Sequence, residues 1–329
     1  MKKSIIKKIF IKICRFFGYE IIDQNLFVSP TLNKELNEDL SIINKKSIVL
    51  PFGEVRITRA VKSLLILFRT NSNIEIWDQN KKRLFERSKI EYSTRSLQSL
   101  INSINFCKEK YPDVKIKIVI IDDSSDEKNL NRIKDVYKNL DLEINIKNLN
   151  HNKYKNIIKK QTSEQTFSNL ASLLCCFETA KEIADDLIFF VEDDYLHFTQ
   201  MLEEMISSYQ RISSQLKKDI FMCPSDYPYL YMNNKKTNIL IGNKRHWRTV
   251  DQTLCTFMTS KNLFNKYWDN FYKNCLNRHE PFEKYINEIY KQEICVSPMK
   301  SLSVHVTNIN SSYGLSPFID YKKLWDESF

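Results

Sequence analysis

The stretch that most constrains the fold is an apolar run at residues 187–191 that ends in three consecutive carboxylates, Glu192, Asp193 and Asp194. Five apolar residues in a row, bounded by acidic residues, are typical of a short strand buried on both faces. Ligands of open α/β sheets bind just beyond the carboxyl ends of the strands. Carboxylate oxygens at that place suit a hard divalent cation, which also relieves their mutual repulsion. For this stretch alone, the alternative is a solvated acidic turn.

A second acidic cluster follows a second predicted strand. Residues 114–121 are mostly apolar and run directly into Asp122-Asp123-Ser124-Ser125-Asp126. An earlier apolar run lies at residues 62–70, and helical patterns lie at residues 128–140 and 166–183. Strands that alternate with helices predict a mainly parallel sheet with right-handed crossovers. If the strands are neighbours, the two acidic clusters share one crevice.

The composition indicates a folded protein with an anionic partner. The chain has 329 residues, only 4 glycines and many aromatic side chains, which excludes a low-complexity or disordered protein. Its net charge of +10 is compatible with a nucleotide, an anionic membrane surface or nucleic acid. The 8 cysteines form no Cys-x-x-Cys pair, which predicts reduced, mostly buried thiols in a cytosolic protein.

Residues 1–17 have a basic amphipathic pattern. On a helical wheel one face is apolar, with Ile5, Ile6, Ile9, Phe10, Ile13, Phe16 and Phe17. The other face is basic, with Lys3, Lys7, Lys8, Lys12 and Arg15, and Lys2 is the exception. Cations interrupt the apolar run too often for a membrane span, which needs about 20 apolar residues, and a signal-peptide core is missing. This pattern predicts a helix that lies on an anionic membrane surface. Packing of its apolar face on the protein's own domain is the alternative.

The order of the two acidic clusters resembles that of the GT-A glycosyltransferases, most closely the family 2 type. In that family the second strand ends in an Asp-Asp-Gly-Ser-x-Asp pattern, which residues 122–126 match with Ser124 in place of the glycine. A later strand of the family ends in an Asp-x-Asp metal motif, and Glu192-Asp193-Asp194 resembles its Glu-Asp-Asp form. The resemblance covers residues 63–198. It implies a three-layer α/β/α sandwich with a mainly parallel central sheet.

The resemblance also implies roles for individual side chains. Asp122 or Asp123 would accept a hydrogen bond from the nucleobase, and Asp193 would lie near the ribose. Asp194 would bind a Mn²⁺ or Mg²⁺ ion that bridges the two phosphates of a nucleotide-sugar donor. Several GT-A enzymes use a late histidine as a further metal or diphosphate ligand, and His305 is the candidate in this chain. A structural histidine between two valines is the alternative.

The domain organisation follows from the same comparison. Residues 1–58 are expected to hold the amphipathic helix and a connector, and residues 59–329 a GT-A-like domain. Its donor half is expected at about residues 59–198 and its acceptor half at about residues 199–329.

Arg69 ends the first predicted strand and could place a positive charge near the nucleotide, although an ordinary surface arginine is the commoner interpretation.

The acceptor half offers a weaker signal. An inverting sugar transfer needs a general base near the acceptor hydroxyl. Asp251 is the first candidate because it lies close in sequence to Trp247, a ring that could stack on a sugar, with Asp226 and Glu280 as rivals. His246, next to Trp247, could contact the diphosphate or the acceptor. A loop cap or a surface ion pair is the alternative for Asp251.

These features predict a metal-dependent glycosyltransferase. The expected donor is a nucleotide-diphospho-sugar, a UDP-sugar in the first instance, and the expected acceptor is a glycan or lipid-linked molecule of cell-surface polysaccharide synthesis. The expected location is cytoplasmic, with peripheral binding to the inner face of the cell membrane.

Two alternative functions stay open. One is a nucleotidyltransferase that uses the same sheet, although the glycine-rich basic loop typical of that class is missing after the first strand. The other is a non-enzymatic basic protein that binds membrane or nucleic acid, although no nucleic-acid-binding motif is evident and no such partner is expected.

Overall fold

The structure is a computed structural model that describes residues 5–19, 21, 40–49, 53–73, 84–161, 163–232, 236–307 and 311–329. Part of the predicted N-terminal segment, including residues 1–4 and 22–39, therefore lies outside the described residues. A helix, α1, spans Ile5–Phe16, and a small antiparallel hairpin pairs β1 (Lys46–Val49) with β2 (Gly53–Arg56). Within the described residues, no helix is both long enough and apolar enough to cross a bilayer.

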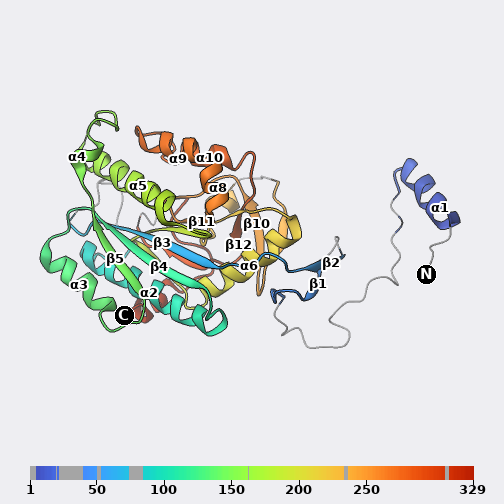
Figure 1. The fold of residues 1–329 in the computed structure, drawn as a ribbon, viewed down its shortest axis with the longest axis horizontal. Helices are drawn as coiled ribbons and strands as arrows, with labels where there is room; N and C mark the ends of the chain where they lie inside the picture. Colours follow the sequence, from blue (N-terminus) through green and yellow to red (C-terminus); the bar gives the residue numbers. More distant parts are fainter. Residues whose placement is uncertain are drawn as a thin grey trace.

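A nine-stranded sheet forms the centre of the fold (Figure 1). Its strands lie in the spatial order β5 (Glu143–Asn148), β4 (Lys115–Asp122), β3 (Ser63–Thr70), β6 (Leu187–Glu192), β11 (Phe257–Ser260), β8 (Phe221–Met222), β12 (Cys295–Pro298), β10 (His246–Val250) and β9 (Ile239–Ile241). The first four strands are parallel, and only β11 and β10 run against the direction of the others. The predicted mainly parallel sheet is therefore confirmed.

Helices cover both faces of this sheet, as the predicted three-layer sandwich requires. Side chains alternate between the faces along β6 because successive residues of a strand point to opposite sides. Phe189 packs with one core and Phe190 with the other. The Phe189 side carries α2 (Lys89–Lys110), α3 (Glu127–Tyr137) and α6 (Met201–Leu216), and the Phe190 side carries α4 (His151–Tyr154), α5 (Glu164–Ile183), α8 (Lys261–Lys266), α9 (Trp268–Cys275) and α10 (Lys284–Ile289) (Figure 1).

The strand register brings the predicted strand exits to one edge. Arg69 of β3 lies beside Glu192 of β6, and Thr70 of β3 lies beside Asp122 of β4. The two acidic clusters are about seventy residues apart in the sequence, and β3 alone separates their strands in the sheet. The expected shared crevice therefore follows directly from the parallel pairing of three neighbouring strands.

A second, two-stranded sheet brings the C-terminal part of the chain to the same edge. β7 (Tyr195–His197) follows the acidic trio directly and pairs antiparallel with β13 (Ser303–His305). The helix α6 begins shortly after β7, at Met201. Two short helices complete the chain, α7 (Tyr229–Met232) and α11 (Tyr321–Glu327).

The core agrees with the predicted chemistry of the apolar residues. Phe190 is buried and packs edge-on against Phe177 at 5.0 Å between ring centroids, with Phe257 at 5.1 Å on another side. All eight cysteines are free thiols, and only Cys14 is not buried. The predicted reduced, mostly buried thiols are therefore what the structure has.

Candidate functional site

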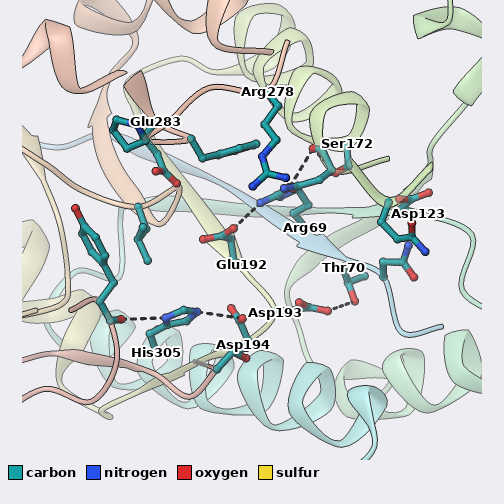
Figure 2. A pocket seen from close by; sticks show the side chains of 18 of the residues that line it. Arg69, Thr70, Asp123, Ser172, Glu192, Asp193, Asp194, Arg278, Glu283 and His305 are labelled. Atoms are coloured by element: carbon teal, nitrogen blue, oxygen red, sulfur yellow. Dashed lines mark hydrogen bonds and ion pairs between the residues drawn. The ribbon is translucent and has the colours of Figure 1, made fainter. Parts of the chain in front are cut away.

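A cavity of about 490 Å³ lies at the carboxyl ends of β3 and β6 (Figure 2). It is also lined by the start of α5, by the segment from Arg278 to Glu283, and by single residues from other parts of the chain, among them Lys89, Leu254, His305, Thr307, Ser311 and Tyr313. The volume is in the range of small-molecule sites, about 300–1,000 Å³. Of the nine residues predicted from sequence to form the site, the structure places Arg69, Asp123, Asp193, Asp194 and His305 on this cavity.

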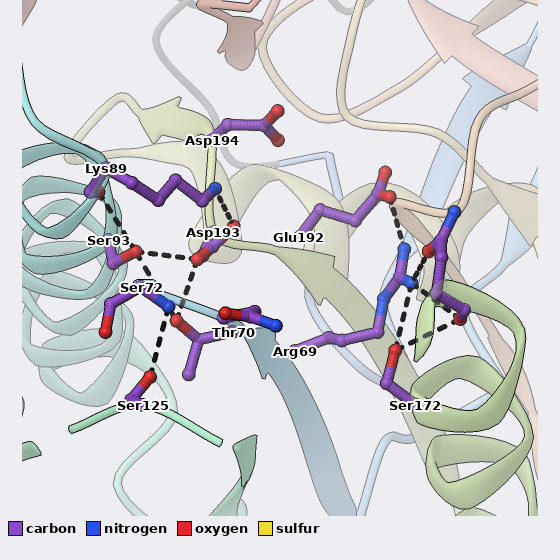
Figure 3. Close-up of polar contacts among 12 residues, drawn as sticks. Arg69, Thr70, Ser72, Lys89, Ser93, Ser125, Ser172, Glu192, Asp193 and Asp194 are labelled. Carbon is purple, nitrogen blue, oxygen red and sulfur yellow. Dashed lines mark hydrogen bonds and ion pairs between the residues drawn. The ribbon is translucent and has the colours of Figure 1, made fainter. Parts of the chain in front are cut away.

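Asp193 is held by three donors at the exit of β6. Its Oδ2 accepts hydrogen bonds from Thr70 Oγ1 at 2.7 Å and from Ser93 Oγ at 2.6 Å (Figure 3). Its Oδ1 forms an ion pair with Lys89 Nζ, at the start of α2. A carboxylate has about four lone-pair positions, so these contacts leave roughly one for a ligand. Asp193 is thus a preorganised acceptor whose position β3, β6 and α2 fix together.

Asp194 and His305 face each other across the β7–β13 pair. His305 Nε2 lies 3.2 Å from Asp194 Oδ2, its Nδ1 lies 3.0 Å from the carbonyl oxygen of Tyr313, and its ring stacks on Tyr195. Burial acts to raise the pKa of Asp194, but the charge and hydrogen bond of His305 outweigh it and hold that pKa well below its usual value. Burial acts to lower the pKa of His305, but Asp194 raises it above the usual value. The two groups therefore form a charged pair.

The same pair has donor atoms suited to a divalent cation. A histidine whose Nδ1–H donates to a backbone carbonyl presents Nε2 to a metal, the orientation common in protein metal sites. A metal would replace the proton that Asp194 and His305 now share. Among the described residues no three or more His, Cys, Asp or Glu side chains are arranged to hold a metal ion. Divalent cations held by one or two protein carboxylates complete their shell with water and substrate phosphate; Asp194 could supply such a carboxylate and His305 a nitrogen ligand beside it.

Arg69 forms an ion pair with Glu192, the first residue of the acidic trio (Figure 3). Its Nη1 also donates to the carbonyl oxygen of Asn169 at 3.1 Å and to Ser172 Oγ at 3.3 Å, both on α5. Burial raises the pKa of Glu192, and the nearby guanidinium of Arg69 acts in the opposite direction. Arg69 is therefore not the surface arginine of the alternative interpretation, because it ties β3, β6 and α5 together.

The first acidic cluster divides into an inner and an outer carboxylate. Asp123 lines the cavity, where His151 Nε2 lies 2.6 Å from its Oδ1 and Ser168 Oγ donates to its Oδ2. Asp122 is buried behind it: Ser125 N donates to its Oδ2 at 3.1 Å, and its Oδ1 has no hydrogen-bond partner among the described residues. Burial raises the pKa of Asp122. Of the two, only Asp123 faces the cavity.

Ser124 keeps the backbone shape that a glycine would supply. Its φ is +61°, in the left-handed region that favours glycine. Ser124 therefore adopts, at the cost of some backbone strain, a conformation in which a glycine would be unstrained.

The three first candidates of the acceptor half, Trp247, His246 and Asp251, do not line the cavity. Trp247 is fully buried in the core beneath α6, with its Nε1 3.4 Å from Glu204 Oε1, so the predicted stacking of its ring on a sugar is corrected. His246 is exposed at the start of β10. Asp251 is exposed and lines a separate cavity of about 210 Å³. The reason is topological: β11, β8 and β12 lie between β6 and β10.

The two rival bases are placed differently from each other. Asp226 is buried in an ion pair with Arg248 and does not line the main cavity. Glu280 does line it, but its side chain is largely exposed and lies 2.9 Å from Arg278 Nη2.

Sequence reasoning missed three residues of this site. Lys89 contacts Asp193, Tyr313 positions His305 through its carbonyl, and Glu283 has its side chain in the cavity wall. Burial, together with the charge of Glu192, raises the pKa of Glu283 to about 7. The one available signal was the density of ionisable residues in Arg278-His279-Glu280-Pro281-Phe282-Glu283, which no motif marks.

Comparisons with known proteins give matches to solved structures only. No family model and no curated protein matches the sequence. The galactosyltransferase LgtC in complex with donor and acceptor sugar analogues is 12% identical with a TM-score of 0.35, over 69% of this chain and 70% of that chain. TarS 1-349 of S. aureus is 11% identical with a TM-score of 0.41, over 73% and 59%. UTP-bound UGPase from Acinetobacter baumannii is 8% identical with a TM-score of 0.40, over 82% and 92%. Likenesses this distant carry no argument about function, which rests below on the cavity itself.

Proposed function

We propose that this chain is a metal-dependent glycosyltransferase of the GT-A type that moves a sugar from a nucleotide-diphospho-sugar to an acceptor hydroxyl. One observation carries the proposal: Asp193 and Asp194, at the exit of a parallel strand, share a cavity with His305, which arrives from the other end of the chain. Asp194 and His305 could bind a cation, and the Asp193 carboxylate beside them accepts hydrogen bonds. Such a group of side chains, at the carboxyl edge of the sheet, suits a nucleotide diphosphate. We take a UDP-sugar as the first donor to test.

Each wall of the cavity has a role in this proposal. Asp194 and His305 would hold Mn²⁺ or Mg²⁺, and the diphosphate would supply further ligands. When bound, the metal supplies a Lewis acid that neutralises the charge on the departing diphosphate. Asp193 would accept a hydrogen bond from the ribose, and Asp123 would accept one from the nucleobase. Arg69 would act through Glu192, by fixing the end of β6, because its guanidinium is already engaged.

A thermal-shift screen tests the proposal. The wild-type chain is heated with UDP-glucose, UDP-galactose and UDP-N-acetylglucosamine, each with and without Mn²⁺. At a ligand concentration of 100 Kd the expected stabilisation is about 2.7 kcal/mol, a shift of several degrees, and it should need donor and metal together. The variant Asp194→Ala should lose the shift. The matched control is Asp135→Ala, which removes an exposed acid on α3.

Two results would contradict the proposal. A donor shift that does not need metal, or one that survives in Asp194→Ala, would remove the assigned metal site. Release of pyrophosphate from UTP and a sugar phosphate, without sugar transfer, would instead assign the cavity to a nucleotidyltransferase.

We also propose that α1 binds an anionic membrane surface, where a lipid-linked or glycan acceptor of cell-surface polysaccharide synthesis would be found. Five of its apolar residues are exposed, from 50% for Ile13 to 86% for Phe16: Ile6, Ile9, Phe10, Ile13 and Phe16. Lys12 and Arg15, on the same helix, are exposed as well. An exposed apolar stripe flanked by cations suits the boundary between acidic headgroups and acyl chains.

Vesicle sedimentation tests the membrane proposal. The chain should sediment with vesicles that contain phosphatidylglycerol and much less with vesicles of phosphatidylcholine alone. The double variant Ile9→Glu/Ile13→Glu should lose the binding, whereas Ile42→Glu, an exposed isoleucine outside α1, should keep it. Equal sedimentation of the double variant and the wild type would contradict the proposal.

A further inference from the structure

The segment from Arg278 to Glu283 forms a wall of the main cavity between α9 and α10. Its last residue, Glu283, is only 8% exposed, whereas Arg278 and Glu280 are exposed. Figure 2 shows the Glu283 carboxylate turned toward the interior of the cavity. A buried carboxylate that faces a ligand-sized cavity, and not bulk water, needs an explanation because the burial of a charge is costly.

The other carboxylates of the cavity wall already have polar partners. Lys89 holds Asp193, His305 holds Asp194, Arg69 holds Glu192, Arg278 holds Glu280, and His151 with Ser168 holds Asp123. Within the described residues, the side chain of Glu283 accepts one weak hydrogen bond, from Cys255 Sγ at 3.6 Å, and contacts no cation. Among these acids Glu283 alone could take up a proton without the loss of an ion pair or a short hydrogen bond.

We propose that Glu283 is the general base of the transfer reaction, which deepens the proposed function and rests on it. The Glu283 carboxylate would take the proton of the acceptor hydroxyl as that oxygen forms a bond to the anomeric carbon of the donor sugar. The bond from that carbon to the diphosphate oxygen breaks, and the nucleotide diphosphate leaves with the electron pair. Glu283 ends the step protonated and returns its proton to water.

The surroundings of Glu283 suit this role. Burial and the nearby charge of Glu192 raise its pKa to about 7, while Arg69 acts to lower it. The other titratable groups that face it are the thiol of Cys255 and the phenol of Tyr313. A general base is most effective when its pKa is close to the working pH.

The cavity around Glu283 also has a surface for a sugar ring. Phe282 precedes Glu283, Leu254 precedes its partner Cys255, and all of these except Cys255 line the cavity together with Tyr313. Aromatic and aliphatic side chains bind the apolar face of a ring, while a carboxylate at its edge reaches a hydroxyl. The acceptor would thus lie between the segment 278–283 and the donor held at β6.

The test compares Glu283→Gln with Glu143→Gln, the same substitution at an exposed glutamate of β5 that does not line the cavity. The donor is whichever of the three UDP-sugars gives the largest Mn²⁺-dependent thermal shift, and the readout is UDP release with water or a simple glycoside as acceptor. General-base catalysis contributes about 10²–10⁴-fold, so kcat of Glu283→Gln should fall by that factor while its donor-dependent thermal shift persists. Glu143→Gln, which removes an exposed ion pair with Lys117, should keep kcat within about threefold, since such a pair contributes little.

The pH profile of the wild type separates a base from a structural residue. The logarithm of kcat/KM should fall as pH decreases below about 7, because the carboxylate becomes protonated, and Glu283→Gln should lack this limb. A wild type with no acid limb near neutrality, or a Glu283→Gln variant as active as the wild type, would overturn the assignment. A wild type that shows no metal-dependent donor binding would overturn the proposed function itself, and so distinguishes the two failures.

Discussion

The ion pair between Arg69 and Glu192 allows the most detailed test of how this site is stabilised. The two side chains are 12% and 24% exposed, so the pair is mostly shielded from water. Replacement of Arg69 by Met keeps much of the apolar stem but removes the cation and its bonds to Asn169 and Ser172. Removal of one partner of a buried pair costs about 3–5 kcal/mol, and because Glu192 retains some contact with water we expect about 2–4 kcal/mol for Arg69→Met.

The loss of stability in Arg69→Met should come largely from the Glu192 carboxylate, which then has no cation partner. In Arg69→Met/Glu192→Gln the uncompensated carboxylate is also gone, so the double variant should be at least about 1 kcal/mol more stable than Arg69→Met alone. The assay is urea unfolding at pH 7, followed by circular dichroism, with the three variants and the wild type measured side by side.

The difference in stability between wild type and Arg69→Met should depend on pH through the ionisation of Glu192. Glu192 already has a raised pKa, and the loss of Arg69 should raise it further. A carboxyl whose folded-state pKa is raised destabilises the fold above its unfolded-state pKa of about 4.3, and this penalty disappears as pH falls toward that value. The gap between wild type and Arg69→Met should therefore narrow from pH 7 to pH 5. A gap that is constant with pH, together with a double variant no more stable than Arg69→Met, would refute the reasoning.

Three further changes have definite expected outcomes. Phe190→Ala should lower the free energy of unfolding in urea by about 3–5 kcal/mol, because it leaves a cavity in a buried aromatic cluster. Ile183→Ala, at an exposed helix end, should lower it by less than about 1 kcal/mol. Equal losses would contradict the assigned core. Ser124→Val should lower the free energy of unfolding by more than about 1 kcal/mol, because a β-branched residue disfavours a φ of +61°. Ser124→Gly should stay within about 1 kcal/mol of the wild type. A valine variant as stable as the wild type would contradict the left-handed turn. His197 is buried, and burial lowers its pKa to about 3. The free energy of unfolding of the wild type should therefore fall by up to about 1.4 kcal/mol per pH unit as pH drops below 6.5, and the difference in stability between wild type and His197→Asn should shrink over the same range. A difference in stability that does not change with pH would contradict a neutral buried ring.

Local sequence patterns predicted the parallel core because the information they need is local. The alternation of apolar residues along β6 sets which side chains face each helical layer, and this requires no knowledge of distant residues. The acidic residues after β4 and β6 lie where predicted because parallel strands end at one edge. His305 was chosen because the resemblance implies a late histidine ligand, and β13 places it 3.2 Å from Asp194.

The acceptor side was not predictable in the same way. Trp247 and Asp251 were chosen for their closeness in sequence, but β10 lies at the far end of the sheet, and the burial of Trp247 reflects contacts with α6 that no short pattern encodes. Glu283 carries no motif. Its burial and its position depend on how α9, α10 and β6 pack around it.

The sequence by itself determined the layers of this protein and the edge of the sheet where its carboxylates gather, because side-chain period and strand direction are properties of short segments. The tertiary structure decided which of those carboxylates pair with cations, and it placed Glu283 in the cavity wall without a cation partner among the described residues. That outcome depends on burial and on contacts between residues more than a hundred positions apart, such as Lys89 with Asp193 and Asp194 with His305. The acidic trio that ends β6 is therefore a local feature, and the chemistry assigned to each of its members is a property of the fold.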